Sequence, residues 1–344
     1  NVNLIREIKK FGLGADVVSK GELMMALKAG VSPKKIVFSG VGKTSEEISF
    51  AVEKKILLIN AESESEIREI NRIAKIKKRK VKIGIRLNPN TDAKTLSQIS
   101  TGKKENKFGV NEKTFLKLVN FCKSSKNIDL KCLSVHIGSQ ILNYKPYEKM
   151  LKVVDRIIHK INHKFEFVDL GGGMGISYTY KDKKLNYKKY SKIIKKFLKK
   201  HKSKIIFEPG RSIIGDTGTL ISKIIYIKKN DSKNFIILDA AMNDLMRPAL
   251  YGAHHQILPS TKSKRKSNKT YEFVGPICES TDKFNTLKNF QELKEKDLIT
   301  ICDVGAYGMS LSSNYNVRLK PSEILIKGSK IKIIRKKQKY KDLM

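Results

Sequence analysis

Short apolar runs alternate with helical periodicity over the first part of the chain. The runs that we expect to form strands cover residues 14–18, 35–38, 56–59, 81–86, 133–137, 165–169 and 204–207. Between them, apolar residues recur at helical spacing over residues 21–29, 45–53, 65–74, 112–122, 147–161 and 187–200. Alternation of this kind predicts parallel strands joined by crossover helices.

Seven such units are one fewer than a TIM-type (β/α)8 barrel contains. The opening helical segment, about residues 4–10, has no strand before it. A closed barrel has no open edge, whereas seven strands would leave two. We therefore expect a (β/α)8 barrel that lacks its first strand, with an open doubly wound sheet as the alternative.

The pattern changes after Arg211 to apolar runs separated by turns, with few helices between them. These runs cover residues 220–226, 235–238, 271–274, 298–301 and 324–326. Closely spaced strands of this kind predict an antiparallel β-barrel or sandwich. We expect two domains, a β/α barrel domain over residues 1–217 and an antiparallel β domain over residues 218–344.

Composition narrows the possible classes of function. The 344 residues carry a net charge of +38, but lysines are spread over nearly every predicted helix and the chain has no Trp. This distribution disfavours specific nucleic-acid binding. No apolar run approaches the roughly 18 residues of a membrane helix. The four cysteines form no Cys-x-x-Cys pair, and His254 and His255 lack metal-ligand spacing, so both histidines read as ordinary polar residues. We expect a cytoplasmic protein without a metal.

Polar motifs follow three neighbouring predicted strands. They are residues 136–139, 171–175 and 208–211, and chemistry in β/α barrels lies at these strand ends. Consecutive glycines at 171–173 can close backbone N–H groups around a phosphate, or simply make a tight turn. Glu208 and Arg211 are either a structural ion pair, or a carboxylate facing a ring nitrogen and a clamp for a substrate carboxylate. Arg247 is a second candidate clamp.

The turn at residues 275–282 sets a thiol, two carboxylates and two hydroxyls behind a Gly-Pro pair. A turn with so much chemistry is typical of a site. Together with the motifs above and residues 305–307, it predicts a phosphate-bearing cofactor and an amino-acid substrate. His136 alone is more typical of a satisfied core histidine, but Gly138 and Ser139 beside it offer a backbone opening and a hydroxyl.

These motifs together resemble those of the diaminopimelate decarboxylases, pyridoxal-phosphate enzymes of the alanine-racemase-like barrel class. The likeness runs over essentially the whole chain. The matching stretches are residues 14–19, 21–23, 136–140, 171–176, 208–211, 275–282 and 305–308. The resemblance implies pyridoxal 5'-phosphate as the cofactor and decarboxylation of an amino acid as the reaction.

The resemblance also implies roles on the cofactor side of the site. Catalytic His136 would stack on the pyridine ring, and catalytic Glu208 would keep the ring nitrogen protonated so that the ring withdraws electrons. The remaining residues expected to contact the cofactor, chiefly around its phosphate, are Ser139, Gly172, Gly173, Gly210, Arg211 and Tyr307.

On the substrate side, the resemblance implies a set that binds the distal end of the substrate, namely Arg211, Arg247, Tyr251 and Tyr307. Glu279 would recognise the distal ammonium group, and catalytic Cys278 would lie near the reacting carbon. In the family this pair is presented to the neighbouring subunit's site, so a homodimer with shared active sites is implied. Whether Cys278 or Tyr307 protonates the product stays open.

The implied substrate is meso-2,6-diaminopimelate, and the products are L-lysine and carbon dioxide. Relatives acting on ornithine or arginine usually carry aspartate after the cysteine, so Glu279 and Arg247 favour diaminopimelate. A polyamine-type decarboxylase and a non-catalytic cofactor-binding homologue remain alternatives.

One family residue has no counterpart in the sequence. The Schiff-base lysine belongs to a motif that ends in asparagine, and Asn1 resembles that asparagine. The lysine would then lie about two residues upstream. We expect the chain as written to bind the cofactor weakly and to lack useful turnover.

Overall fold

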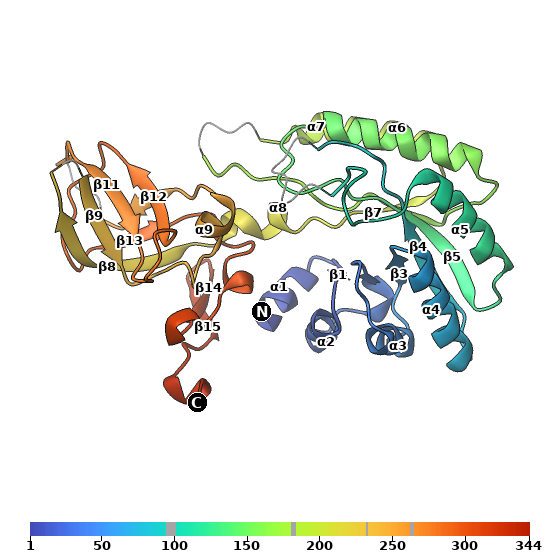
Figure 1. Ribbon diagram of the computed structural model, residues 1–344, viewed down its shortest axis with the longest axis horizontal. Helices are drawn as coiled ribbons and strands as arrows, with labels where there is room; N and C mark the ends of the chain where they lie inside the picture. Colours follow the sequence, from blue (N-terminus) through green and yellow to red (C-terminus); the bar gives the residue numbers. More distant parts are fainter. Residues whose placement is uncertain (94–100, 180–183, 232, 262–264) are drawn as a thin grey trace. The chain divides into compact units, whose positions relative to one another are not determined.

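A computed structural model describes residues 1–93, 101–179, 184–231, 233–261 and 265–344 (Figure 1). The chain forms two compact units. The first comprises Asn1–Gly175 and Leu185–Pro209, and the second comprises Ile176–Lys184 and Gly210–Met344. The Glu208–Arg211 motif therefore runs from the end of one unit into the beginning of the other.

The first unit is built on seven parallel strands that pair in chain order. They are β1 (Ala15–Val17), β2 (Ile36–Phe38), β3 (Leu58–Ala61), β4 (Val81–Arg86), β5 (Ile128–Ser134), β6 (Phe167–Asp169) and β7 (Lys204–Ile206). All seven predicted strands are confirmed. A doubly wound sheet reverses its strand order at a switch point, and this sheet does not, so that alternative is wrong.

Helices connect these strands at the predicted places. They are α1 (Val2–Lys9), α2 (Lys20–Lys28), α3 (Ser45–Lys54), α4 (Glu64–Ile76), α5 (Glu112–Ser124), α6 (Lys145–Lys160) and α7 (Tyr187–Lys200). In α4, Ile67, Ile70 and Ile73 recur every three residues and are all buried. Each such side chain contributes about 1.5–3 kcal/mol when fully buried. Ser63 begins the helix by accepting a hydrogen bond from the Glu66 N–H.

Several boundaries in the first unit differ from the prediction by one to three residues, and the difference is largest at β5, which begins at Ile128 rather than at residue 133. The apolar run at residues 133–137 predicts a strand that includes His136, but β5 ends at Ser134. His136 therefore lies in the loop after the strand. In this loop Gly138 has a φ of +147°, a value that residues with a side chain rarely adopt. A loop position allows the imidazole to reach groups that follow the neighbouring strand.

The second unit contains a six-stranded sheet and a separate hairpin. In spatial order the sheet strands are β10 (Ile257–Pro259), β13 (Leu298–Ile301), β8 (Leu220–Lys229), β9 (Lys233–Leu238), β11 (Thr270–Val274) and β12 (Lys283–Leu287). The hairpin pairs β14 (Glu323–Lys327) with β15 (Lys330–Arg335), and the short helices are α8 (Arg211–Ile214) and α9 (Arg247–Tyr251). The hydrophobic core of the second unit includes Ile224, Phe273 and Ile299.

The antiparallel prediction for this domain is wrong at one pair of strands. β9 and β11 are parallel, because the chain between them passes through α9 and β10 before it returns in the same direction. The other pairs in the sheet are antiparallel. The apolar runs did not predict β10, β12 or β15.

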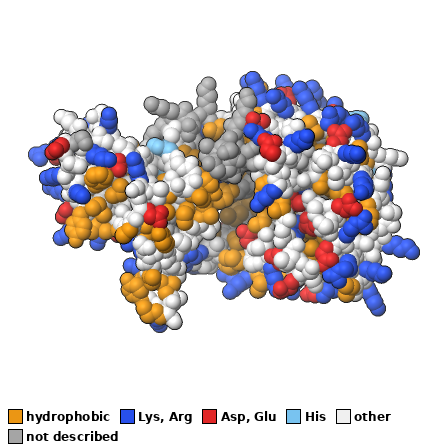
Figure 2. Space-filling view, in the orientation of Figure 1, with side chains coloured by type: hydrophobic (Ala, Val, Ile, Leu, Met, Phe, Trp, Pro, Cys, Tyr) orange, Lys and Arg blue, Asp and Glu red, His pale blue; other side chains and the backbone are white. Residues whose placement is uncertain are grey.

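The described residues include no helix that is long and apolar enough to cross a membrane. Figure 2 shows Lys and Arg side chains scattered over the visible face, with acidic side chains among them. On this face the basic charge is distributed rather than gathered into one patch, as the sequence indicates.

Candidate functional site

Polar groups of the first unit meet at the C-terminal ends of β5, β6 and β7. His136 follows β5, the glycines at 171–173 follow β6, and Glu208 follows β7. These three strands are adjacent and parallel, so their ends lie at one edge of the sheet. The Gly172 N–H donates a hydrogen bond to His136 Nδ1 at 3.1 Å. The structure thus brings together the residues that the sequence predicts for the cofactor ring.

The three glycines are required by their surroundings. A β-carbon at Gly172 would lie 2.0 Å from the Glu208 carbonyl oxygen, and one at Gly173 would lie 2.2 Å from the Gly138 carbonyl oxygen. Gly171 and Gly173 also have positive φ angles of +64° and +88°. The run therefore forms a cradle that no side chain can enter.

The N–H groups of this cradle are not equivalent. The Gly171 N–H donates to Asp169 Oδ1 at 3.0 Å, and the Gly172 N–H donates to His136. Neither donor is available to a phosphate in this arrangement. Gly172 can therefore line a phosphate site only through its lack of a side chain, whereas Gly173 is the cradle residue that can offer an N–H.

His136 is a neutral imidazole in this arrangement. Burial, followed by the positive charge of Arg86, lowers its pKa to about 3. Because Nδ1 accepts the Gly172 hydrogen bond, the ring proton lies on Nε2. A neutral, half-buried ring can cover the face of an aromatic ligand without adding charge.

A buried pair of carboxyl groups lies at the same edge. Asp169 is completely buried and accepts a hydrogen bond from Asn60 Nδ2 at 2.9 Å. Ser39 Oγ donates to Glu208 Oε1 at 3.5 Å. Burial, then repulsion from Asp169 and Asp16, raises the pKa of Glu208 well above its usual value. The raised pKa favours the protonated form of Glu208, which donates a hydrogen bond to Asp169.

Asp169 is a functional candidate that the sequence reasoning missed. Its signal is its position, since it ends a predicted strand directly before the glycine run. Arg86 is the cation that acts on this carboxyl pair, but it also forms an ion pair with Glu62 at 2.8 Å. The pair is therefore suited to a ligand that brings a cationic N–H.

In the second unit, Arg211 and Arg247 are both buried, with 6% of each exposed. Arg211 NH1 donates to the Tyr178 hydroxyl at 2.5 Å, and its guanidinium carbon lies 4.8 Å from the centre of the Tyr307 ring. The Arg247 guanidinium carbon lies 4.5 Å from the centre of the Tyr178 ring. The structure thus brings together Arg211, Arg247 and Tyr307, as the substrate prediction requires.

Among the residues that the structure describes, no acidic side chain forms an ion pair with Arg247. Burial lowers its pKa, and the charged or titratable groups that act on it most strongly are Tyr178, Arg211, Tyr307 and Tyr251. None of these is a carboxylate. A buried guanidinium is normally paired, so this arrangement attracts an anion such as a ligand carboxylate. Tyr251 ends the helix that Arg247 begins and is half-buried.

His255 overturns the expectation that both adjacent histidines are ordinary polar residues. His254 is exposed, but His255 is completely buried and lies 2.7 Å from Arg247 through Nε2. Tyr178 was missed as well. Its sequence signal is its place three residues after Gly175 in the glycine-rich motif.

The turn at residues 275–282 divides into a structural part and an exposed part. The buried Asp282 carboxylate accepts hydrogen bonds from the N–H groups of Ile277 and Met242, at 2.8 and 2.7 Å. It therefore shapes the turn. Cys278 and Glu279 remain exposed, and Glu279 accepts hydrogen bonds from the Tyr315 and Thr281 hydroxyls.

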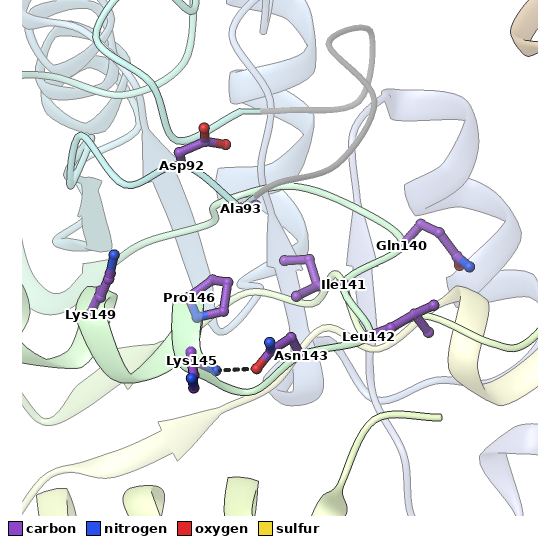
Figure 3. Close-up of a pocket in the computed structure, with 9 residues that line it drawn as sticks. All are labelled: Asp92, Ala93, Gln140, Ile141, Leu142, Asn143, Lys145, Pro146 and Lys149. Carbon is purple, nitrogen blue, oxygen red and sulfur yellow. Dashed lines mark hydrogen bonds between the residues drawn. The ribbon is translucent and has the colours of Figure 1, made fainter. Parts of the chain in front are cut away.

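The first unit contains a pocket of about 360 Å³, and Figure 3 shows the side chains around it. The residues that line it are Asp92, Ala93, Gln140, Ile141, Leu142, Asn143, Lys145, Pro146 and Lys149. Its size is within the range of small-molecule sites. It contains none of the predicted site residues, although Gln140 directly follows Ser139, which is half-buried.

A group of possible metal ligands lies elsewhere in the first unit. Asp155, His159 and His201 place their ligand atoms within 4.8 Å of one another. The Asp155 carboxylate already bonds His201 Nε2 at 2.6 Å and Lys200 at 2.8 Å. These contacts join α6 to the end of α7, so we assign the group a structural role.

Comparison with known proteins gives a consistent result. The family model described as "Pyridoxal-dependent decarboxylase, pyridoxal binding domain" matches residues 1–215. A diaminopimelate decarboxylase of Aquifex aeolicus is 39% identical over 99% of this chain and 81% of its own length. One from Helicobacter pylori is 42% identical over 100% of this chain and 85% of its own length.

Solved structures agree. The crystal structure of Helicobacter pylori diaminopimelate decarboxylase complexed with L-lysine matches with a TM-score of 0.95 at 42% identity, over 100% of this chain and 86% of that one. The M. jannaschii enzyme in complex with L-lysine matches with a TM-score of 0.92 at 35% identity, over 100% of this chain and 81% of that one. The predicted fold class, a partial β/α barrel followed by a β domain, is confirmed.

Proposed function

We propose that this chain, which belongs to the diaminopimelate decarboxylase family, converts meso-2,6-diaminopimelate into L-lysine and carbon dioxide with pyridoxal 5'-phosphate. This reaction is the last step of lysine biosynthesis. The observation that carries the choice of substrate is the pair of buried arginines, Arg211 and Arg247, in an environment of tyrosine and histidine side chains.

The residues of the first unit fit the cofactor. The glycine cradle leaves room for a phosphate group, and neutral His136 can cover one face of the pyridine ring. The Glu208 and Asp169 pair suits a protonated ring nitrogen. When bound, the cofactor supplies an electron-withdrawing ring that stabilises the negative charge left when carbon dioxide departs.

The proposed role of Glu208 depends on whether its own carboxyl group or the ring nitrogen of the cofactor holds a shared proton. The raised pKa of Glu208 favours the form of the carboxyl group that holds a proton, and this proton is available to a base that binds beside it. With the cofactor bound, Glu208 would face the ring nitrogen and could share this proton with it, and the poorly solvated surroundings would strengthen the attraction between the carboxylate and a cationic N–H. The Asn60 amide donates a hydrogen bond to Asp169 and so orients the carboxylate that accepts from Glu208. We assign the contacts around the phosphate to Ser139, Gly173, Gly210 and Tyr307.

The second unit supplies the substrate side. Decarboxylation breaks the bond between the reacting carbon and one carboxylate, and a proton takes the place of the carbon dioxide. The other amino-acid head is unchanged and becomes the head of lysine. We assign its carboxylate to Arg211 and Arg247, with Tyr251 and Tyr307 beside them, and its ammonium group to Glu279. Cys278 and Tyr307 are the candidates that deliver the proton.

We further propose a cytoplasmic homodimer in which Cys278 and Glu279 complete the partner's site. Both residues are exposed, and neither belongs to the cluster around Arg247. All four cysteines are free, which fits a reducing compartment.

Turnover by the full gene product, with its Schiff-base lysine and loaded with pyridoxal 5'-phosphate, tests the choice of substrate. We expect carbon dioxide release from meso-diaminopimelate with a kcat/KM at least about a hundredfold above that for ornithine or arginine, because these amines lack the second carboxylate. The measurement is release of labelled carbon dioxide from each substrate under identical conditions. Faster release from ornithine would instead support a polyamine-type decarboxylase, and cofactor binding without any release would support a non-catalytic homologue.

A further inference from the structure

His255 lies in the interior of the second unit, between an arginine and a backbone carbonyl. It follows α9 and comes just before β10. Its Nε2 lies 2.7 Å from Arg247 NH1, and its Nδ1 lies 2.8 Å from the Cys302 carbonyl oxygen. Its ring also meets the Tyr178 ring edge-on, with centroids 5.3 Å apart and planes at 74°. Both ring nitrogens are therefore engaged.

The two neighbours of His255 determine where its proton lies. A guanidinium group can only donate hydrogen bonds, so Nε2 must accept from Arg247. A carbonyl oxygen can only accept, so Nδ1 must donate to Cys302. Only the neutral tautomer with its proton on Nδ1 satisfies both contacts. Burial, which is opposed by the Cys302 carbonyl and helped by Arg247, lowers the pKa of His255 to about 4.

A neutral acceptor has a particular advantage at this place. A long arginine side chain needs a partner to hold its plane, and an acidic residue is the usual choice. A carboxylate, however, would neutralise the guanidinium and compete with an incoming anion. Neutral His255 fixes one edge of Arg247 while the Tyr178 ring supports its face at 4.5 Å. The full positive charge of Arg247 remains available to a ligand.

We propose that His255 is a positioning residue that aims Arg247 at the carboxylate of the unreacted amino-acid head and thereby sets the preference for a substrate with a second carboxylate. The proposal deepens the function proposed above and rests on it. His255 touches Arg247 and not the substrate, so its effect is on recognition of the head group. The chemical step at the other end of the substrate is affected little.

A matched pair of variants separates the two contacts of His255. In His255→Gln, the side-chain amide can place its oxygen near the position of Nε2 and still accept from Arg247. In His255→Asn, the shorter amide can donate to the Cys302 carbonyl but does not reach Arg247. Two ligands of the holoenzyme then test recognition of the head-group carboxylate. L-lysine has this carboxylate, and 1,5-diaminopentane has the same carbon chain and amino groups without it.

We expect His255→Asn to weaken competitive inhibition by L-lysine about tenfold, because a hydrogen bond that orients a charged group is lost. Inhibition by 1,5-diaminopentane should change less than about twofold, and His255→Gln should keep most of the preference for L-lysine. For meso-diaminopimelate, KM should rise in His255→Asn while kcat changes little. Thermal unfolding of each variant checks that the fold is retained.

Three results would overturn the inference. They are equal effects of the Asn and Gln variants, equal weakening of both inhibitors, and a wild-type protein that does not prefer L-lysine to 1,5-diaminopentane. Nitrogen NMR of wild-type histidines needs no variant, and a proton on Nε2 of His255 at neutral pH would also overturn it. If direct calorimetric binding of the two probes to the holoenzyme changes as expected in the variants but the wild type releases no carbon dioxide from diaminopimelate, the inference stands and the proposed function fails.

Discussion

The two units of this protein carry clusters with opposite electrostatic character. In the first unit, the carboxyl groups of Asp169 and Glu208 lie close together and repel each other when both are charged. The second unit holds Arg211 and Arg247 with tyrosine and histidine partners. One cluster has an excess of acidic groups and the other an excess of basic ones. Each is thereby suited to a ligand group of the other sign, a cationic ring nitrogen in the first and a carboxylate in the second.

Each cluster also contains a neutral histidine, but the ring protons lie on different atoms. His136 accepts at Nδ1 from a backbone N–H, which leaves its proton on Nε2. His255 donates from Nδ1 to a backbone carbonyl, which leaves Nε2 to accept from Arg247. The backbone group beside Nδ1 therefore decides what the rest of the ring can do. The comparison shows how one residue type serves a ring-stacking surface in one place and a charge-orienting contact in another.

The largest effect is expected from removing the titrating carboxyl group of the acidic cluster. Glu208→Gln keeps the size of the side chain but cannot transfer a proton to a ring nitrogen. We expect kcat to fall about a hundredfold to a thousandfold, measured as carbon dioxide release by the holoenzyme. Ser39→Ala removes the 3.5 Å hydrogen bond to Glu208 and the contacts of the same hydroxyl with Asn60 and Asp16, but it leaves the carboxyl group in place and should cost much less.

The same variant tests the shared site. Mixing Glu208→Gln subunits with Cys278→Ala subunits should restore about a quarter of the wild-type sites if half of the dimers are mixed, because one site in each mixed dimer is intact. Without recovery after subunit exchange, the assignment of Cys278 to the partner's site would be lost. Near-normal turnover by Glu208→Gln alone would contradict the proton transfer.

A smaller effect is expected at the glycine cradle. A β-carbon at Gly172 would lie 2.0 Å from a backbone oxygen that cannot easily move. Gly172→Ala should lower the free energy of unfolding by about 2 kcal/mol, measured by chemical denaturation. Gly42→Ala is the matched control, because a β-carbon there meets nothing within 4 Å.

Gly210 separates cofactor binding from stability. A β-carbon there also meets nothing within 4 Å of the protein. Gly210→Ala should therefore unfold like the wild type but bind pyridoxal phosphate more weakly, if a phosphate lies against this residue. Unchanged cofactor affinity in Gly210→Ala would remove Gly210 from the proposed phosphate contacts.

The smallest effect concerns the pH dependence of stability. The pKa of His255 is lowered to about 4 in the folded protein, from an ordinary value of 6.5. Between these values the unfolded chain binds more protons, so stability falls as the pH falls. We expect His255 to contribute a loss of about 1 kcal/mol between pH 7.5 and 5.5. Because Arg247, His254 and Arg211 also act on this ring, the test compares wild type with His255→Gln, whose loss over this range should be smaller by that amount. Equal losses of unfolding free energy in wild type and His255→Gln over this pH range would refute the lowered pKa of His255.

Much of the first unit could be predicted from the sequence, because each strand there is a compact apolar run and each helix has a clear apolar face. α7 begins and ends at the predicted residues, 187 and 200. β12 was harder, because its Lys-Phe-Asn-Thr-Leu sequence mixes polar residues into a half-exposed strand. The parallel pairing of β9 with β11 depends on a long crossover, which periodicity does not reveal.

The sequence predicted the site residues that belong to recognisable motifs. It missed the residues whose role comes from contacts made only in the folded chain. His136, the glycine run and Glu208 follow strands and can be read from spacing. His255 could not be recognised, because its importance comes from contacts with Arg247 and Cys302, which lie 8 and 47 residues away in the chain. Asp282 was read as part of the chemistry of its turn, but its hydrogen bonds to Ile277 and Met242 give it a structural role.

The internal bracing of that turn has a consequence for assembly. Because the Asp282 carboxylate fixes the backbone at Ile277 and Met242, Cys278 and Glu279 are displayed on a loop whose shape is set before any encounter. A partner that docks onto such a loop loses little conformational entropy in ordering it. Association should then resemble the meeting of two rigid bodies, with a rate governed by orientation and by long-range charge.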